Sequence, residues 1–435
     1  MTAADRFVPD TRGPTQPRTQ AETYPPFEEH KRVASNFEAT EKMTTTYRLQ
    51  GISSDVQQKE AIPGLLRKAW GLPGSTAITA HSLATDPTGP GRKTATVTFE
   101  ETPGFLRSGD RTSWKSPGDS GLHLDTDFHG LTPLHSDVDS DCILDVIAVS
   151  GHAFGSFNCK KYSFMWLRDG LPRDLRQTRI FVYGYDTKKS SQSVMDHGSK
   201  LRDAVKGLRP SGKDPLRPLI FIGHSLGGMV VKQAIIDLHG SSENDDKMNF
   251  ESLRAIFFFG VPNLGANTES FMDMAEGKPC EKLVQFPHPR GDGLRWQQRY
   301  FAPLLRKFAR YWYYETTGTR TPEKTGSGWA MTGSPQILVD MQSATNGLPM
   351  PWEQDEHFVY PINHNHSELV RFPDRGYMDY GVVCRHLDRV KEAVLQSQGD
   401  TSLSDDAKTV DWGVRRVIAD REMPLPHRVL SFGSE

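Results

Sequence analysis

Between residues 143 and 261, short apolar runs alternate with longer segments whose apolar residues recur at helical spacing. The apolar runs cover 143–150, 179–185, 219–222 and 253–261, and the helical segments between them cover 162–175, 194–208 and 226–239. Near-continuous apolar runs are typical of strands that are buried on both faces of a parallel sheet. The alternation therefore predicts a doubly wound, mostly parallel sheet with right-handed crossovers, in an α/β domain over residues 141–396.

The rest of the chain differs in composition from this domain. Residues 1–42 are rich in Pro, Thr, Arg and Glu and predict a disordered tail, as does most of 397–435. The strand–helix–strand–strand pattern of 43–100 predicts a small α+β module of ferredoxin-like type. The Gly, Ser and Pro content of 101–140 favours a linker or long loop, and 264–310, with little strand pattern, is a candidate cap or insertion.

Composition narrows the class of protein. A formal charge of −2 over 435 residues and a pI near 6.7 provide no overall attraction to nucleic acid or to an anionic membrane. The four cysteines form no CxxC pair and no metal-ligand spacing, so we expect no metal, no cofactor and an intracellular location. No apolar run reaches the ~18–20 residues of a membrane-spanning helix, and no signal peptide is evident. We expect a protein that is soluble or peripheral to a membrane.

The strongest local pattern is the segment Gly223-His224-Ser225-Leu226-Gly227. A buried strand runs directly into it, and a largely apolar helix follows. Strand, tight turn and helix are the context of a nucleophile elbow, which holds a serine hydroxyl at the carboxyl edge of a sheet. Ser225 is therefore the candidate nucleophile, and the amide of Leu226, at the start of the helix, is the first candidate donor to an oxyanion.

A serine hydroxyl needs a base within hydrogen-bonding reach, and in this type of sheet the chain order is serine, acid, histidine. The base must then come late in the chain. His366 is the preferred candidate because it follows the last expected strand and precedes the closing helix at 377–396. His364 is the alternate, and His357 comes third.

The acid is expected at the end of the penultimate strand. Glu315 ends the strongly β-forming run Tyr311-Trp312-Tyr313-Tyr314. Asp340, at the end of a second candidate strand over 336–340, is the alternate. A second oxyanion donor should come from the loop after the first strand of the domain, where the amides of His152 and Ala153 are the candidates.

Several segments resemble fungal members of the serine active site-containing protein family, which are lipase-like α/β hydrolases. The similar segments are 145–157, 165–172, 183–186, 223–234, 257–262 and 365–372, within a likeness over about 141–395. The resemblance implies an α/β-hydrolase fold, a serine esterase or lipase-type activity on lipid acyl esters, and a link to phospholipid handling at mitochondria or the endoplasmic reticulum.

One departure from that family bears on catalysis. Its members have a longer Gly-rich stretch after the early strand, whereas Gly151 is followed at once by His152 here. Loss of one oxyanion donor costs about 10²–10³ in turnover in a hydrolase. A catalytically inactive binding or regulatory protein with this fold is therefore the alternative hypothesis.

The N-terminal module suggests a different class of function. Arg92, Ala95, Val97 and Phe99 match part of an RNA-recognition strand, but its main stacking positions hold Thr94 and Thr96. Base stacking without aromatic rings loses its main source of energy. We therefore expect no nucleic acid partner, and a module for packing or for a protein partner.

Overall fold

The computed structural model describes residues 45–89, 91–107, 110–136, 142–151, 154–159, 163–209, 217–326, 328–347 and 357–400. The expected N-terminal tail, 1–42, lies outside these residues. Most of the expected C-terminal tail lies outside them too, although the last helix, α11 (Met378–Asp400), extends four residues into the predicted tail range.

A seven-stranded sheet forms the larger domain, in the order β18-β13-β12-β11-β7-β10-β6. All neighbouring pairs are parallel except β6 with β10, which are antiparallel at the edge. The strands are β6 (Gly130–Ser136), β7 (Leu144–Ser150), β10 (Thr178–Gly184), β11 (Leu219–His224), β12 (Leu253–Phe259), β13 (Ala309–Glu315) and β18 (His357–Ile362). This strand order, with a serine turn directly after β11, is that of an α/β hydrolase and confirms the expected fold class.

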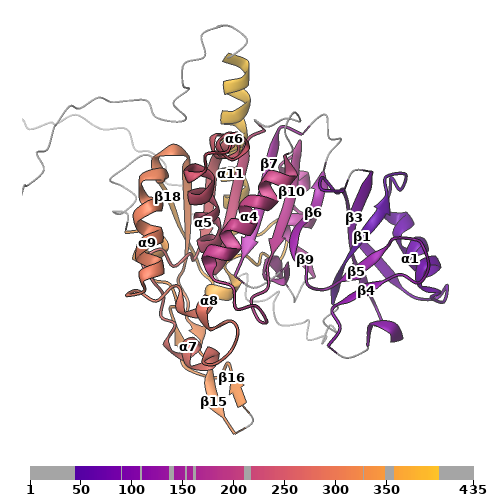
Figure 1. Cartoon of the computed structure of the whole chain (residues 1–435), viewed down its shortest axis with the longest axis horizontal. Coiled ribbons are helices and arrows are strands. Elements are labelled where there is room, and N and C mark those ends of the chain that lie inside the picture. Colours follow the sequence, from indigo (N-terminus) through magenta and orange to yellow (C-terminus); the bar gives the residue numbers. More distant parts are fainter. Residues whose placement is uncertain are drawn as a thin grey trace, which may run out of the picture. The chain divides into compact units, whose positions relative to one another are not determined.

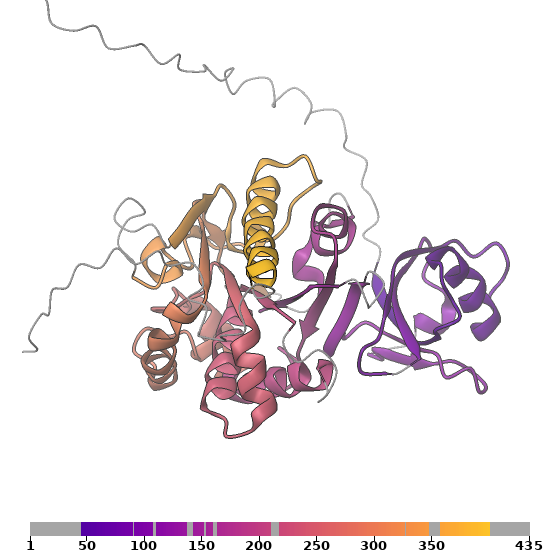
Figure 2. The same cartoon turned by 90° about the horizontal axis from the view of Figure 1, so that it is seen from above.

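Helices cover both faces of this sheet, because its central strands are apolar on both sides. One face packs on α4 (Val194–Leu208), α5 (Leu226–Gly240) and α9 (Asp292–Phe301). The other packs on α2 (Trp166–Asp169), α3 (Leu171–Asp174) and α11. Figure 2 shows α11 and α5 on opposite sides of the sheet. Helix α6 (Asn244–Ser252) precedes β12, and a single helix predicted over 162–175 is divided at Gly170 into α2 and α3.

The N-terminal module is a five-stranded antiparallel sheet in the order β2-β3-β1-β5-β4 (Figure 1). Its strands are β1 (Thr46–Ser53), β2 (Ile78–Thr85), β3 (Arg92–Phe99), β4 (Ser113–Lys115) and β5 (His123–Asp125), and its helix is α1 (Ile62–Trp70). Strand β3 lies between β1 and β2, as in the first half of a ferredoxin-like fold. Ile62 and Leu66 of α1 pack on the sheet together with Leu49 and Val97.

The expectation of a linker over 101–140 is wrong. This stretch contributes β4 and β5 to the module and β6 to the large sheet. Trp114, Leu122 and Leu124 are buried in the core of the module, so a few large apolar residues outweigh the surrounding Gly, Ser and Pro. Pro133 is tolerated in β6 because that strand lies at the sheet edge. A buried ion pair, Arg48 Nε to Asp125 Oδ2 at 2.8 Å, ties β1 to β5, and Arg48 Nη1 also donates to Thr132 Oγ1 of β6.

The region 264–310, expected as a cap or insertion, has two parts. Helices α7 (Glu269–Ala275) and α8 (Glu281–Gln285) are short and follow β12. Helix α9 and the 3₁₀ segment Ala302–Lys307 belong to the core, where Leu294, Phe301, Leu304 and Leu305 are buried against the sheet. An excursion between β13 and β18 adds two small ribbons, β14 (Thr319–Arg320) with β17 (Pro335–Gln336) and β15 (Glu323–Thr325) with β16 (Gly328–Ala330), and α10 (Met341–Ala344).

Candidate active site

Ser225 occupies a strained turn between β11 and α5. Its backbone has φ 54° and ψ −132°, a conformation that a residue with a side chain rarely adopts. Two glycines make the turn possible. A Cβ on Gly223 would lie 2.6 Å from the Gly228 Cα, and one on Gly227 would lie 2.4 Å from the Val149 oxygen. The turn therefore lifts the hydroxyl out at the carboxyl edge of the sheet.

His366 stands directly beside this hydroxyl. Its Nε2 lies 2.8 Å from Ser225 Oγ, and its Nδ1 lies 2.5 Å from Glu315 Oε2. A carboxylate can only accept, so Nδ1 carries the proton and Nε2 is left to accept the proton of Ser225. The side chain of His366 is 12% exposed and that of Glu315 is fully buried. The arrangement is a nucleophile, a base and an orienting acid in one hydrogen-bonded chain.

Glu315 is the last residue of β13, at the carboxyl edge. Its second oxygen, Oε1, accepts from the backbone N–H groups of Leu338 and Val339 at 2.5 and 3.2 Å. These bonds compensate for burying the polar oxygen atoms of the carboxylate. Asp340 is placed differently: it is the N-cap of α10, where its Oδ1 accepts from the Ser343 backbone.

The other candidate histidines have other partners. His364 Nε2 lies 2.8 Å from the Tyr377 hydroxyl, and His357 is the first residue of β18, at the far end of the strand that leads to His366. Sequence reasoning missed β18 and placed a strand at 336–340, where only Pro335–Gln336 pairs. The run of three consecutive β-forming residues, Phe358-Val359-Tyr360, was the available indication.

The oxyanion side of the site is described in part. As the first residue of α5, Leu226 has a backbone N–H with no helical acceptor. Gly151 packs against this turn, since a Cβ there would lie 3.2 Å from the Leu226 nitrogen. The two other candidate donors, His152 and Ala153, lie outside the described residues.

Two supports of His366 were not predicted. Gly260 follows β12 with φ +53°, and a Cβ there would lie 2.7 Å from Leu369 Cδ1 and 3.1 Å from His366 Nδ1, so any side chain would crowd the ring. Thr319 Oγ1 of β14 accepts from the His366 backbone N–H at 2.9 Å. The glycine directly after a buried strand could have been noticed in the sequence, whereas nothing marked Thr319.

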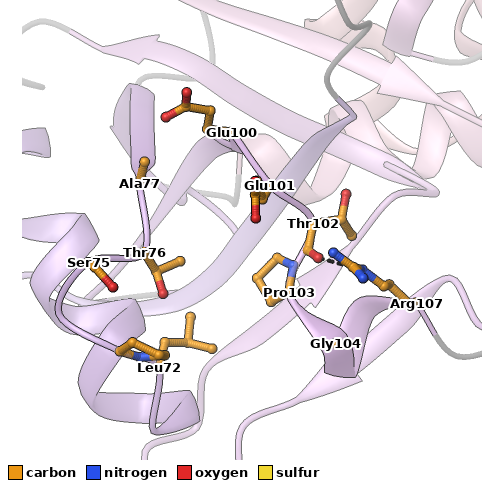
Figure 3. Close-up of a pocket in the computed structure, with 11 residues that line it drawn as sticks. Leu72, Ser75, Thr76, Ala77, Glu100, Glu101, Thr102, Pro103, Gly104 and Arg107 are labelled. Carbon is orange, nitrogen blue, oxygen red and sulfur yellow. Dashed lines mark hydrogen bonds between the residues drawn. The ribbon is translucent and has the colours of Figure 1, made fainter.

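Two cavities in the described part of the chain have linings that do not include Ser225. One, of about 610 Å³, is lined by residues of 265–269, 288–290 and 337–340, and includes Leu338, whose N–H binds Glu315. The other, of about 580 Å³, belongs to the N-terminal module (Figure 3). There Thr76 and Ala77 face Glu101 and Pro103, and Arg107 Nε donates to the Thr102 carbonyl at 2.8 Å. Within the described residues, no group of His, Cys, Asp and Glu could hold a metal ion.

Known proteins share limited sequence similarity with this chain. No family model matches it. It is 28% identical to Protein SERAC1 of Bos taurus over 120 residues. This match covers 26% of this chain and 17% of that protein. Over 134 residues it is 26% identical to the SERAC1 of Danio rerio, which is 29% and 19% of the two chains. The chain thus spans about a fifth of the length of these curated relatives.

Solved structures with a comparable arrangement include the mature lipase BlEst2 of Bacillus licheniformis, at a TM-score of 0.36 and 11% identity. That match covers 59% of this chain and 97% of the lipase. Esterase B from Lactobacillus rhamnosis matches at a TM-score of 0.38 and 11% identity over 81% of this chain and 99% of the esterase. No helix among the described residues is long and apolar enough to cross a bilayer. The chain has an α/β-hydrolase fold, by its strand order and elbow, and a limited sequence similarity to SERAC1.

Proposed function

We propose that this protein is a serine hydrolase that cleaves carboxyl esters through an acyl-enzyme. The observation that carries the proposal is the continuous chain from Glu315 through His366 to the hydroxyl of Ser225, at 2.5 and 2.8 Å. Serine hydroxyls in ordinary turns have neither the strained backbone nor a buried imidazole–carboxylate pair beside them. Both features cost stability, and such costs cluster at functional sites.

The reaction follows from the proton assignment of His366, in which Nδ1 is protonated and Nε2 is free to accept. Ser225 Oγ attacks the ester carbonyl while its proton passes to His366 Nε2, and Glu315 stabilises the imidazolium that forms. The Leu226 N–H stabilises the developing oxyanion. The proton then passes from Nε2 to the leaving alcohol, which leaves an acyl group on Ser225. Water, deprotonated by the same nitrogen, releases the acid and restores the hydroxyl.

A lipid acyl ester is the substrate class that we favour. Two large apolar side chains, Leu264 and Ile337, are 42% and 38% exposed on segments that lead away from β12 and toward the amides that hold Glu315. Exposed apolar residues near such a site suit a fatty acyl chain. The resemblance to fungal members of the serine active site-containing protein family also favours a lipid substrate. It further suggests that the protein acts peripherally at mitochondria or the endoplasmic reticulum.

Ester turnover tests this proposal. The wild-type chain and Ser225→Ala are assayed on p-nitrophenyl esters whose acyl chains range from acetyl to palmitoyl. We expect turnover in the wild type that is lost in Ser225→Ala, and a preference for the longer chains. Equal turnover in both proteins would refute the role of Ser225, and a preference for acetyl would refute the lipid substrate class.

The second candidate function is a catalytically inactive binding or regulatory protein. It is favoured by one observation, the shortness of the segment after β7, in which Gly151 is followed at once by His152. This function predicts a folded protein, with an unfolding transition shared by Ser225→Ala, that hydrolyses none of the esters. Turnover that depends on Ser225 would exclude it.

A further inference from the structure

The residue before the nucleophile, His224, makes two hydrogen bonds that the proposed reaction does not use. Its Nε2 lies 2.9 Å from the backbone oxygen of His366, and its Nδ1 lies 3.2 Å from Ser150 Oγ. His224 and Ser150 are each 3% exposed. The rings of His224 and His366 stand 5.3 Å apart between centroids.

The proton on His224 can be assigned from its partners. A carbonyl oxygen only accepts, so Nε2 of His224 must donate to His366. In the neutral ring Nδ1 then accepts from the Ser150 hydroxyl. One imidazole thus joins the turn after β7, the nucleophile turn after β11 and the segment after β18. A third bond closes this arrangement, because the His224 backbone oxygen accepts from Gly151 N–H at 3.1 Å.

His366 is held at every polar atom. Its ring nitrogens bind Ser225 and Glu315, its backbone N–H binds Thr319 Oγ1, and its backbone oxygen binds His224. The segment around it is a single 3₁₀ turn, His366–Glu368, which has little rigidity of its own. The main chain of the base is therefore positioned from outside, and His224 is the group that fixes its carbonyl end.

We propose that His224 is a positioning residue, which aligns His366 Nε2 with Ser225 Oγ by anchoring the His366 carbonyl. This inference rests on the proposed function and deepens it. It assigns to the second residue of the Gly-His-Ser-Leu-Gly segment a role in the geometry of the base. The His366 carbonyl selects the His224 tautomer that donates from Nε2, and the Ser150 hydroxyl donates to Nδ1.

Two substitutions separate the two bonds of His224. The amide nitrogen of Gln reaches the place of Nε2 and keeps a donor for His366, whereas Asn reaches only the place of Nδ1 and keeps an acceptor for Ser150. We expect kcat to fall about 10²-fold in His224→Asn, with KM within about twofold, because misplacement of a reacting group by about 1 Å costs that much. His224→Gln is expected to retain kcat within about fivefold.

The matched control is His364→Asn, which changes a neighbouring histidine whose ring binds Tyr377 instead. We expect its kcat to match the wild type. If His224 had a purely structural role, the two His224 variants would show similar losses of melting temperature, and they would also show similar losses of kcat. Wild-type kcat in His224→Asn, or a folded His224→Gln as impaired as His224→Asn, would overturn the proposal. The Gln variant alone decides the question if the Asn variant fails to fold.

A second readout does not depend on turnover. The proton shared by His366 Nδ1 and Glu315 gives a far-downfield signal in proton NMR. We expect this signal in the wild type and in His224→Gln, and its loss or shift in His224→Asn. An unchanged signal in His224→Asn would overturn the positioning role even in a protein without ester turnover. Absence of Ser225-dependent turnover with the expected NMR pattern would instead refute the proposed function and leave the positioning role standing.

Discussion

The two sheets of the molecule differ in which residues have a positive φ and in how far the carboxylates at their candidate sites are exposed. In the N-terminal module, between residues 45 and 107, the described positions with positive φ are all glycines, such as Gly51, Gly71 and Gly91. Glu100 and Glu101, the two carboxylates that line its cavity, are exposed. At the carboxyl edge of the seven-stranded sheet, Ser225 takes a positive φ with a full side chain, and Glu315 is buried.

The difference shows where the fold accepts a cost. A strained non-glycine residue costs of order 1–3 kcal/mol, and a buried carboxylate costs more unless hydrogen bonds compensate for it. The described residues of the module between 45 and 107 avoid the strain, because their positive φ values fall on glycines. The edge of the large sheet combines strain, burial and a chain of hydrogen bonds at one serine, which is why we place catalysis there.

The largest effect is expected from Glu315→Gln. The amide of Gln would donate to His366 Nδ1 and force the ring into the tautomer that cannot accept the Ser225 proton. We expect kcat for ester hydrolysis to fall about 10⁴-fold, as for loss of a triad acid. The control is Asp340→Asn, because Asn also caps helices well. It should leave kcat within about twofold, and a reversed order of the two variants would assign the acid to Asp340.

The next effect, a smaller loss of kcat, is expected from Gly260→Ala. The same change at Gly71, in the module, is its control. Gly260→Ala places a methyl group 3.1 Å from His366 Nδ1 at φ +53°. Displacing the base should lower kcat about 10²-fold. Gly71→Ala meets a similar φ, +61°, in the module, with no atom within 4 Å. Each variant should lose about 1–2 kcal/mol of unfolding free energy from the backbone alone. An active Gly260→Ala would show that the base needs no such room.

Buried cations provide the next contrast. In the module, Arg48 is paired with Asp125, whereas Lys232 of α5 is fully buried and its Nζ binds the neutral oxygens of Asn263 and Gln298 at 3.2 and 3.3 Å. Burial lowers the pKa of Lys232 from 10.5 to about 7. Between these values the unfolded chain holds a proton that the native state has released, so native stability should rise with pH over this window.

Lys232→Met tests that sign. We expect the unfolding free energy of the wild type to rise by on the order of 2 kcal/mol relative to this variant between pH 7 and pH 10. Urea unfolding at several pH values measures the difference. Lys247→Met, at an exposed position of α6, is the control and should run parallel to the wild type. If the unfolding free energies of the wild type and of Lys232→Met change with pH in parallel, the pKa of Lys232 is not lowered in the native state.

The smallest effect is expected inside the module. Thr94 is fully buried, and its Oγ1 has no hydrogen-bond partner among the described residues. Thr94→Val should therefore raise the unfolding free energy by about 1 kcal/mol. Thr96 Oγ1 binds Ser82 Oγ at 2.7 Å, so Thr96→Val should lower it by a similar amount. Neither change should alter ester turnover, and a change in kcat would connect the module to the site.

The sequence was sufficient to predict the parts that follow from local patterns. Buried parallel strands are apolar throughout, and the Gly-rich turn around Ser225 is flanked by an apolar run typical of a strand and by a segment typical of a helix. The order of serine, acid and histidine along the chain favoured Glu315 and His366 but left Asp340 and His364 open as alternates. The structure brings Glu315 and His366 together. Contacts between distant segments leave no such local pattern, so the support from Thr319 and the anchor between His224 and His366 were not predicted.

Antiparallel strands were harder to predict than parallel ones. Strands β4 and β5 have three residues each, and β6 is buried only over its three central residues, within a stretch rich in Gly, Ser and Pro. The burial of Trp114 and Leu124 depends on β1 and β3 being already in place, which composition cannot show. The strand expected at 336–340 was predicted from an apolar run that does not pair with another strand. Its backbone N–H groups at Leu338 and Val339 bind Glu315 instead.

The central claim is that Ser225 is an activated nucleophile, and covalent labelling tests it most directly. The full chain is treated with a fluorophosphonate probe, digested, and the modified peptide is identified by mass spectrometry. We expect a single adduct on Ser225, whose formation is abolished in Ser225→Ala and slowed at least 10²-fold in Glu315→Gln. A folded wild-type protein that forms no adduct, or one labelled equally in Ser225→Ala, would contradict the account.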